Sequence, residues 1–227
     1  MALVLAIGAG PDGTESKLLR AGLIKLPAAK TTGSLSVEQT MLKRRSVRNF
    51  TSDPIDLAEL SQLLWAAQGV SGKRRYRTAP SAGALYPLEV FVVVGNVTGI
   101  APGSYRYIPK GHYLLKVLPN DRRDDLTDAA LRQEWIAQAP AVVVIAGVYE
   151  RTAVKYGRRA QQYVHIEAGC ACQNIYLQAT ARNLASTCVG AFTDERVQKV
   201  IGMNANERPL VVMPVGHPKQ GQSGDVK

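Results

Sequence analysis

Cysteine, histidine and aromatic residues are scarce in this chain of 227 residues. It has three cysteines and three histidines, and aromatic residues make up 6% of it. A small, odd number of cysteines argues against a disulfide scaffold and favours a reducing compartment. Cys170 and Cys172 are two positions apart in a predicted helix, so their side chains point about 200° apart. Because no zinc-site spacing occurs elsewhere, we expect no metal.

Long apolar runs are also missing. No stretch reaches the roughly 18–20 apolar residues that span a bilayer. Residues 1–7 are apolar but have no basic residue before them, which is atypical of a signal peptide. With 46% hydrophobic and 20% charged residues, the composition excludes global disorder. We expect a soluble, cytoplasmic protein with no membrane partner.

Acidic residues are outnumbered by basic ones. The chain has 28 Lys and Arg against 18 Asp and Glu, a net charge of +10, with basic clusters at residues 43–48, 73–77 and 151–159. A nucleic-acid-binding protein is therefore one alternative. It has little support, because aromatic residues are few and no RNP, KH or helix-turn-helix pattern occurs. We expect no nucleic-acid partner.

A nucleotide-binding glycine motif lacks its usual context. Residues 8–13 match G-x-G-x-x-G, but Pro11 lies inside the turn and no acidic residue occurs between Glu15 and Glu38. A Rossmann site needs a following helix, a second strand and an acidic residue about 20 positions on. We therefore expect no dinucleotide fold here. No P-loop or nucleophile elbow occurs either.

Two helix starts carry capping boxes. Ser36 is followed three residues later by Gln39, and Asp56 by Glu59. In such a box the two side chains satisfy each other's backbone N–H groups. The second helix has leucines on one face and is expected to end at Gly69.

The remaining elements interleave irregularly. Helices are expected over residues 122–138, 161–182 and 194–201, and strands over 88–94, 105–108, 113–118, 141–148, 186–191 and 210–215. This order predicts a single α+β domain with a mixed or mostly antiparallel sheet. The helix over 161–182 is apolar on several sides, which is typical of a buried helix. We place the domain at 34–220, after a poorly patterned segment 1–33 with a short helix over 15–23, and before a frayed tail 221–227.

Four short segments carry the chemistry. KRRSVR at 43–48 offers three arginines and a serine hydroxyl, a donor set that suits phosphate. The alternative is a solvated basic helix end, where cations favour the helix dipole. TAPSAGALYP at 78–87 has small residues beside a strand, which let a flat ligand approach the backbone. VGAF at 189–192 and MPVGHP at 213–218 are only turns when taken alone.

Taken together, these segments resemble the flavin-dependent nitroreductase superfamily, and within it the SagB-type subgroup that includes azoline dehydrogenases. The matching segments are RRSVR at 44–48, LLWAAQG at 63–69, APSAGALYP at 79–87, KYG at 155–157, EAG at 167–169, QN at 173–174, YLQ at 176–178, VGAF at 189–192 and VGHP at 215–218. They occur in the expected order and span about residues 36–218. The resemblance implies a nitroreductase-like α+β homodimer, with a central sheet flanked by helices, a long buried helix, and FMN at the dimer interface.

The resemblance also implies which residues bind FMN. The phosphate and ribityl chain would be held by Arg44, Arg45, Ser46 and Arg48. The flavin of the other subunit would be contacted by Pro80, Ser81, Ala82 and Gly83. The isoalloxazine ring would lie near Gly190 and Ala191, and the phosphate side near Gly216 and Lys219.

In this family the flavin supplies the redox chemistry, with N5 accepting or delivering a hydride. In azoline dehydrogenases a Lys-Tyr pair is the proposed acid/base partner, and Lys155 and Tyr156 match it. A lysine acts as a base only when its pKa is lowered, which the basic neighbours at 151, 158 and 159 would favour. The alternative is a solvated basic surface run.

Three functions follow from the resemblance. The first is reduction of nitroaromatics, quinones or similar small acceptors by NADH or NADPH. The second is oxidation of peptide thiazolines or oxazolines to azoles, with oxygen as acceptor. It needs a separate cyclodehydratase, because the chain has no such domain of its own. The third is flavin binding without turnover.

Overall fold

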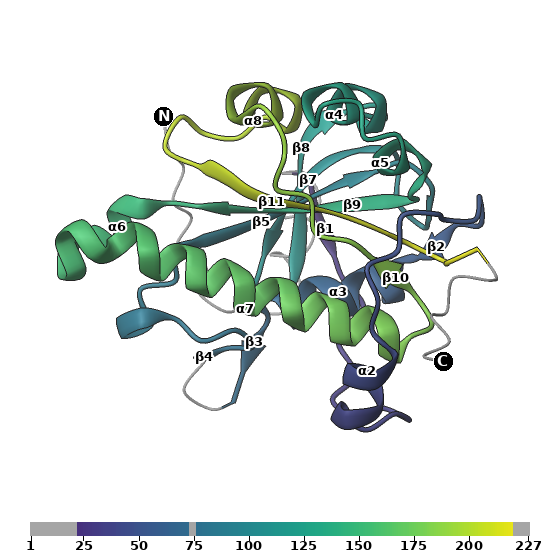
Figure 1. Cartoon of the computed structure of the whole chain (residues 1–227), viewed down its shortest axis with the longest axis horizontal. Helices are drawn as coiled ribbons and strands as arrows, with labels where there is room; N and C mark the ends of the chain where they lie inside the picture. The colour runs from purple at the N-terminus through teal and green to yellow at the C-terminus, as the bar shows by residue number, and fades with distance from the viewer. Residues whose placement is uncertain (1–21, 73–75, 220–227) are drawn as a thin grey trace, which may run out of the picture.

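A seven-stranded antiparallel sheet forms the centre of the molecule (Figure 1). The computed structural model describes residues 22–72 and 76–219. The strands lie in the order β1-β8-β7-β5-β9-β11-β10. Their bounds are β1 Leu23–Lys25, β5 Leu88–Val94, β7 Gly103–Ile108, β8 Tyr113–Pro119, β9 Ala141–Gly147, β10 Ala185–Ser186 and β11 Arg208–Gly216. The expected α+β class with an antiparallel sheet is confirmed.

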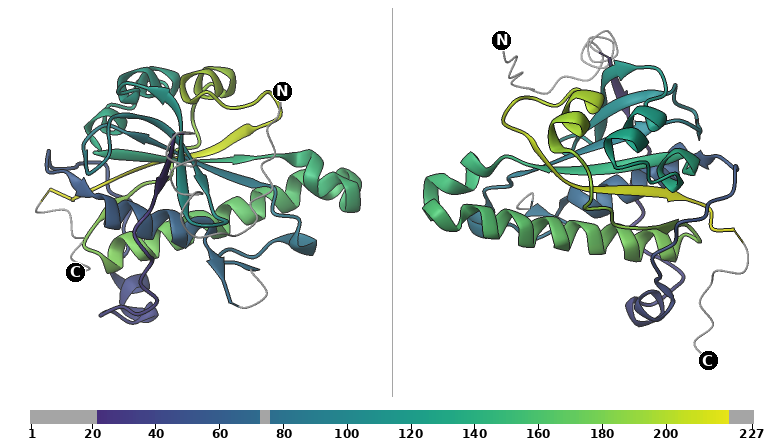
Figure 2. Two further views of the ribbon diagram at one scale, coloured as in Figure 1. Left: turned by 180° about the vertical axis from the view of Figure 1, so that it is seen from behind. Right: turned by 45° about the horizontal axis from the view of Figure 1, so that its top comes forward.

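Helices cover both faces of this sheet. In Figures 1 and 2, α3 (Leu57–Gln68) and α7 (Ala160–Ala181) lie on one face, and α4 (Arg123–Ala129), α5 (Trp135–Gln138) and α8 (Asp194–Ile201) lie on the other. Alternate residues of β5 therefore enter different cores: Val90 and Val92 pack with α3 and α7, whereas Phe91 and Val93 pack with α4, α5 and α8. Because both faces are buried, residues 90–94 of β5 and the whole of β9 are continuous apolar runs.

Several expected elements are confirmed with little change. Ser36 and Asp56 form capping boxes at the starts of α2 (Val37–Lys43) and α3, and α3 ends at Gly69. The predicted strand at 88–94 and helix at 194–201 have the expected bounds. Strands β7 and β8 form the expected hairpin. These elements are specified by local capping and by continuous or periodic apolar patterns.

Two expected elements are wrong in extent. The helix expected over 122–138 is split into α4 and α5, because Leu131 and Arg132 adopt left-handed φ angles of +57° and +58°. Its halves thereby bury Leu126 and Ile136 in the same core. The strand expected over 186–191 is reduced to β10 and an isolated bridge between Val189 and Val212.

One helix was not expected. Tyr149–Tyr156 forms α6, followed by the 3₁₀ turn η2 (Gly157–Arg159). The only buried residue of α6 is Thr152, so its sequence has no apolar stripe to reveal it. The short pairs β2 (Ile55–Asp56) with β6 (Val97–Thr98) and β3 (Val70–Ser71) with β4 (Tyr76–Arg77), and the 3₁₀ turn η1 (Ala82–Ala84), complete the described elements.

The described part of the N-terminal segment joins the main sheet. Strand β1 pairs antiparallel with β8 at the sheet edge, and Leu26 is 2% exposed. The carbonyl of His112 accepts a hydrogen bond from the Leu26 N–H. The helix expected over 15–23 lies outside the described residues up to position 21, and Leu23 is in β1. The glycine motif at 8–13 and the tail at 221–227 also lie outside the described residues.

Helix α7 is buried on one side only. Nine of its 22 residues are buried, all on the side facing the sheet and α3. On the other side Gln162, Gly169 and Gln173 are exposed, and Ile166 is 55% exposed. A single chain therefore leaves one face of this apolar helix uncovered. In the part of the chain that the structure describes, no helix is both long and apolar enough to cross a membrane.

Candidate functional site

The arginine segment after α2 lies beside the end of β11. The Val47 N–H donates to the carbonyl of Ser186, and the Lys219 N–H donates to the carbonyl of Asn49, at 3.0 and 3.1 Å. Gly216 ends β11, two residues before a bridge between Phe50 and Pro218. The structure thus brings residues 44–51, β10 and residues 216–219 together, as the expected phosphate site requires.

The arginines of this segment differ in their partners. Arg45 donates from one nitrogen to the carbonyls of Leu42 and Arg44, both at 2.8 Å, so it caps the end of α2. The guanidinium of Arg44 lies 5.2 Å from the ring centroid of Tyr176, and that of Arg48 lies 5.7 Å from the ring of Trp135. Among residues 22–72 and 76–219, no carboxylate forms an ion pair with any of the three. Two of the three positive charges are therefore available to an anion.

Buried polar atoms beside this segment lack partners. The hydroxyl of Ser186 and the indole N–H of Trp135 have no hydrogen-bond partner within the described part of the chain. Ser186 is 1% exposed and bridges Ser46. A buried donor without a partner is unfavourable unless a ligand or a water molecule accepts its hydrogen bond. Guanidinium, hydroxyl and indole donors together fit the phosphate end of FMN, so the site is compatible with the expected cofactor.

Tyr176 connects the arginine segment to the strand end at 188–191. Its hydroxyl lies 3.2 Å from Ser46 Oγ and accepts a hydrogen bond from the Cys188 N–H at 2.6 Å. Gly190 and Ala191 follow and are exposed. Among the described residues, a Cβ added at Gly190 would meet nothing within 4 Å. This strand end is therefore open beside the arginines, where the flavin ring was expected.

Lys155 and Tyr156, the expected acid/base pair, lie beside Gly83 of the 80–83 loop. A Cβ added there would lie 3.1 Å from the Tyr156 hydroxyl and 3.2 Å from Lys155 Nζ. Helix α6, which the pattern of the sequence did not reveal, carries this pair to the loop. The loop at 80–83 and the Lys155–Tyr156 pair, about 70 residues apart in the chain, therefore meet. The resemblance implied a flavin contact for the loop and an acid/base role for the pair.

The loop that holds Gly83 is tightly bent. Gly83, Ala84 and Tyr86 have φ angles of +63°, +54° and +48°, a region that residues other than glycine rarely adopt. Ser81 supports the bend, because its hydroxyl accepts the Tyr86 N–H at 2.9 Å and its carbonyl accepts the Ala84 N–H at 3.0 Å. Such a strained loop persists only when its surroundings hold it in place.

Glu167 of α7 is the buried residue that holds this loop. Its Oε1 accepts a hydrogen bond from the Ala82 N–H at 2.8 Å, whereas Oε2 is buried and has no partner in the described residues. The residue is 4% exposed, and burial raises the pKa of its carboxyl. Sequence analysis quoted Glu167 only as part of a motif. The signal that could have revealed this role is that Glu167 is a single carboxylate among apolar residues in the middle of the expected helix.

The two groups lie at different places along α7. Glu167 and Tyr176 are nine residues apart, which is roughly 14 Å along a helix axis. Figure 1 shows α6 and α2 near opposite ends of α7. One chain therefore does not place the 80–83 loop against the arginine segment. The expected residues form two half-sites, one with residues 44–48, 190–191, 216 and 219, the other with 80–83, 155 and 156.

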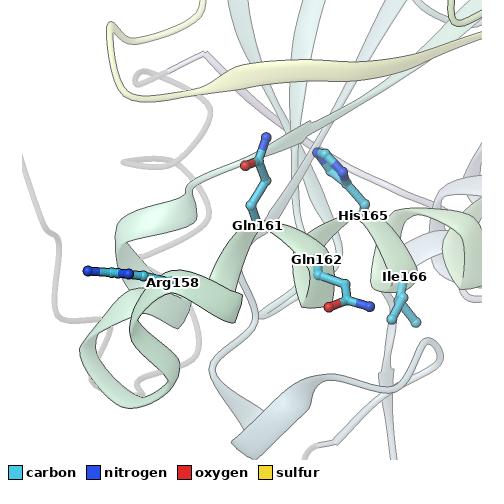
Figure 3. Close-up of a pocket in the computed structure, with 5 residues that line it drawn as sticks. All are labelled: Arg158, Gln161, Gln162, His165 and Ile166. Atoms are coloured by element: carbon cyan, nitrogen blue, oxygen red, sulfur yellow. The ribbon is translucent and has the colours of Figure 1, made fainter.

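An open pocket lies between η2 and the first turns of α7. It is lined by Arg158, Gln161, Gln162, His165 and Ile166, all exposed (Figure 3). His165 Nε2 lies 2.6 Å from the Tyr149 hydroxyl. In the described ranges, no group of three or more His, Cys, Asp and Glu side chains is placed to hold a metal ion.

Comparison with known proteins shows to which family the chain is similar. Residues 41–217 match the sequence model of the nitroreductase family. A protein of Methanocaldococcus jannaschii, provisionally named nitroreductase MJ1384, is 46% identical over 182 residues, which are 80% of this chain and 91% of that protein. The microcin B17-processing protein McbC of Escherichia coli is 29% identical over 148 residues, 62% of this chain and 54% of McbC.

A crystal structure has the same fold. It is that of a Ralstonia eutropha protein provisionally described as a nitroreductase, with a TM-score of 0.77 and 27% sequence identity, and the match covers 88% of this chain and 90% of that one. The expected nitroreductase-like fold is therefore confirmed. Since the family model matches residues 41–217, more than half of the chain, the chain belongs to the nitroreductase family and is an oxidoreductase.

Proposed function

We propose that this protein is an FMN-dependent oxidoreductase. It transfers a hydride between NADH or NADPH and a nitroaromatic, quinone or similar small acceptor, through flavin N5. The observation that carries this proposal is the donor set around residues 44–48: two arginines without ion pairs, next to a buried serine hydroxyl and an indole N–H without partners.

Each half-site residue has a role in this proposal. Arg44, Arg48 and Ser46 bind the phosphate and ribityl chain, with Gly216 and Lys219 at the same edge. Arg45 caps α2 and adds positive charge. The open strand end at Gly190 and Ala191 lies against the ring, where backbone N–H groups orient it.

A homodimer with FMN at its interface accounts for the separation of the half-sites. Glu167, which contacts the 80–83 loop, is roughly 14 Å along α7 from Tyr176, which contacts the arginine segment of the same chain. A second copy would supply that loop and cover the exposed side of α7, where Ile166 is 55% exposed.

The side chains have little redox chemistry to perform. When bound, FMN supplies the hydride-accepting and hydride-donating chemistry. The arginines bind and orient the cofactor by its anionic end. Glu167 holds the loop in a fixed conformation through the Ala82 N–H. Lys155 Nζ and the Tyr156 hydroxyl lie beside Gly83, the position from which an acid/base pair would exchange a proton with a substrate.

The proposal predicts that the purified protein is yellow and releases FMN, and not FAD, on denaturation. It should oxidise NADH or NADPH when a nitroaromatic or a quinone is present. The measurements are the absorption spectrum, chromatography of the released cofactor and steady-state turnover. A colourless protein that takes up no added FMN would contradict the proposal. Bound FMN that neither nicotinamide reduces in stopped-flow mixing would indicate flavin binding without turnover.

A second candidate function is oxidation of peptide azolines to azoles. The contact of Lys155 and Tyr156 with the loop at Gly83 favours it, because this reaction needs a base opposite the hydride acceptor. The 29% identity to McbC also supports it. This function requires a cyclodehydratase as a separate partner to produce the azoline. A neighbouring cyclodehydratase gene would favour it over the general reductase.

Replacing Lys155 with alanine distinguishes the two functions. If the pair is the acid/base group, Lys155→Ala should slow azoline oxidation by roughly 10²- to 10⁴-fold, the usual contribution of general acid–base catalysis. Reduction of a quinone, which needs no such base, should change little. Arg158→Ala is the matched control, since it removes a positive charge from the same exposed stretch. If both variants have equal rates with every substrate, Lys155 has no acid/base role and is only a charged surface residue.

A further inference from the structure

A row of charged side chains joins α6 to the sheet. Glu207, the residue before β11, accepts two hydrogen bonds from the guanidinium of Arg106 in β7, at 2.6 and 2.8 Å. Arg106 also donates to Oε2 of Glu89 in β5 at 3.0 Å. The other oxygen of Glu89 accepts a hydrogen bond from Arg151 of α6 at 2.5 Å. Negative and positive groups therefore alternate from the start of β11 to α6, and each contact is a charge-assisted hydrogen bond.

This row is buried at the end that lies on the sheet. The side chain of Glu207 is 3% exposed and those of Arg106 and Glu89 are each 16% exposed, whereas that of Arg151 is 43% exposed. The Asn204 N–H also donates to Glu207, at 2.6 Å. An isolated surface ion pair contributes little to stability. Here, however, the carboxylate that Arg151 contacts is already fixed by buried neighbours, so it is a rigid acceptor.

Arg151 has a second acceptor in the loop at 81–86. Its other terminal nitrogen donates to the carbonyl of Tyr86 at 3.1 Å. Tyr86 has a φ angle of +48°, so this carbonyl belongs to a strained conformation that its surroundings must hold. In the part of the chain that the structure describes, no other hydrogen bond joins α6 to this loop. The planar fork of a guanidinium reaches a carboxylate and a carbonyl at once, which a lysine ammonium does less well.

Helix α6 has little apolar support of its own. Thr152 is its one buried residue among those the structure describes. Its contacts with α7 include two aromatic pairs, Tyr149 with His165 and Tyr156 with Tyr163. These pairs hold the helix to α7 but do not join it to the loop. The position of α6 relative to the loop therefore depends on polar contacts, which open more easily than a packed core.

We propose that Arg151 is a positioning residue, which holds α6 against the loop at 81–86 and so keeps the Lys155–Tyr156 pair beside that loop. Lys155 is four residues after Arg151, on the same face of the helix. The sequence suggested that Arg151 repels a proton from Lys155, but the charge of Arg151 is paired with Glu89. The kinetic part of this inference rests on the proposed acid/base role of Lys155 and Tyr156, whereas the contact itself does not.

The kinetic test compares Arg151→Ala with the original protein, loaded with FMN, in oxidation of a peptide thiazoline. We expect kcat to fall by roughly 10- to 100-fold and KM to change little, because misplacing a reacting group by about 1 Å can cost 10²-fold in rate. Arg151→Lys keeps the charge but not the fork, and should recover only part of the loss. Arg158→Ala is the matched control, since it removes the same charge from the same exposed stretch, and it should leave kcat unchanged.

A double variant separates positioning from a general structural loss. If Arg151 acts through Lys155, adding Arg151→Ala to Lys155→Ala should slow the reaction no further, because residues that act as a unit are not additive. Two losses that multiply in the double variant would overturn the positioning role.

Hydrogen exchange of the protein without substrate tests the contact independently of any activity. In Arg151→Ala, the N–H groups of Ala84 and Tyr86 should exchange roughly 2- to 10-fold faster, as expected for loss of one partly exposed hydrogen bond. Exchange in α3 should stay the same, which shows that the variant is folded, and Arg158→Ala should match the original protein. Unchanged exchange in the loop would overturn the proposal, even in an inactive protein. Faster exchange in a protein that turns over no substrate would support the contact and contradict only the proposed function.

Discussion

Arg48→Ala should weaken binding of FMN by roughly 10- to 100-fold. A hydrogen bond to a charged group contributes about 1.5–3 kcal/mol, and each 1.4 kcal/mol is a factor of ten in affinity. Arg48 forms no ion pair with a carboxylate in the described chain and lies over Trp135, whose indole N–H is also unpartnered. Its positive charge is therefore available to the doubly charged phosphate. Titration of the apoprotein with FMN, followed by flavin fluorescence, measures the loss.

The matched control for this variant is Arg132→Ala. Arg132 has the same charge, and its side chain is 85% exposed on the turn after α4, 3.9 Å from Asp128. Removing it changes the net charge equally and leaves the arginine segment intact. If the effect were only one of net charge, both variants would bind FMN with equally reduced affinity. That result would contradict the assignment of residues 44–48 to the phosphate site. The loss for Arg48→Ala should also shrink as salt is raised, because charge screening weakens the original interaction.

Glu167→Ala should destabilise the protein and release the loop at 81–86. It leaves the Ala82 N–H without its acceptor and creates a cavity, and a lost buried hydrogen bond alone costs about 1–3 kcal/mol. Urea unfolding should show this loss, with a melting temperature lower by several degrees. Lys155 and Tyr156 would lose their fixed neighbour at Gly83, so turnover should fall further than FMN binding. Gln161→Ala, an exposed change in the first turn of the same helix, is the control.

Glu167 also predicts a pH dependence. Burial raises the pKa of its carboxyl above the ordinary value of 4.5, so the folded state binds this proton more tightly than the unfolded state. Its contribution to the free energy of unfolding is therefore largest below pH 4.5. It falls as the pH rises from there through the folded pKa, and is constant above it.

The comparison that isolates this contribution is with Glu167→Gln, which keeps an acceptor for the Ala82 N–H and does not titrate. The stability of the original protein relative to this variant should decrease as the pH rises above 4.5. Urea unfolding at a series of pH values measures the difference. A difference that stays constant, or that grows with pH, would show that the carboxyl is not stabilised in its neutral form.

The arginine segment and the loop at 78–87 were recognisable in the sequence because their residue types carry their chemistry locally. Guanidinium groups bind phosphate, and small residues admit a flat ligand, wherever the chain places them. The structure adds which arginines are available: Arg45 turns back to the end of α2, whereas Arg44 and Arg48 do not. That difference depends on backbone direction after the helix, which residue types do not reveal.

The role of Glu167 was not recognisable from the sequence. A carboxylate in a helix is usually solvated, and only packing of the loop against α7 places Glu167 within 2.8 Å of the Ala82 N–H. The hydrogen bond from the Cys188 N–H to the Tyr176 hydroxyl depends in the same way on α7 lying beside β10 and β11. Long-range contacts of this kind join residues whose spacing in the chain carries no signal.

The sequence by itself determined the elements that local forces specify. Capping boxes begin α2 and α3, and the continuous apolar runs at residues 90–94 of β5 and in β9 require a sheet covered on both faces. Tertiary structure decided the rest: where the helix over 122–138 breaks, that residues 149–156 are helical, and that β1 joins the sheet edge. It also decided that the site residues divide into two half-sites along α7. The reason is physical, since hydrogen bonds of neighbouring residues are encoded within a few positions, whereas burial depends on segments that meet only after the chain has folded.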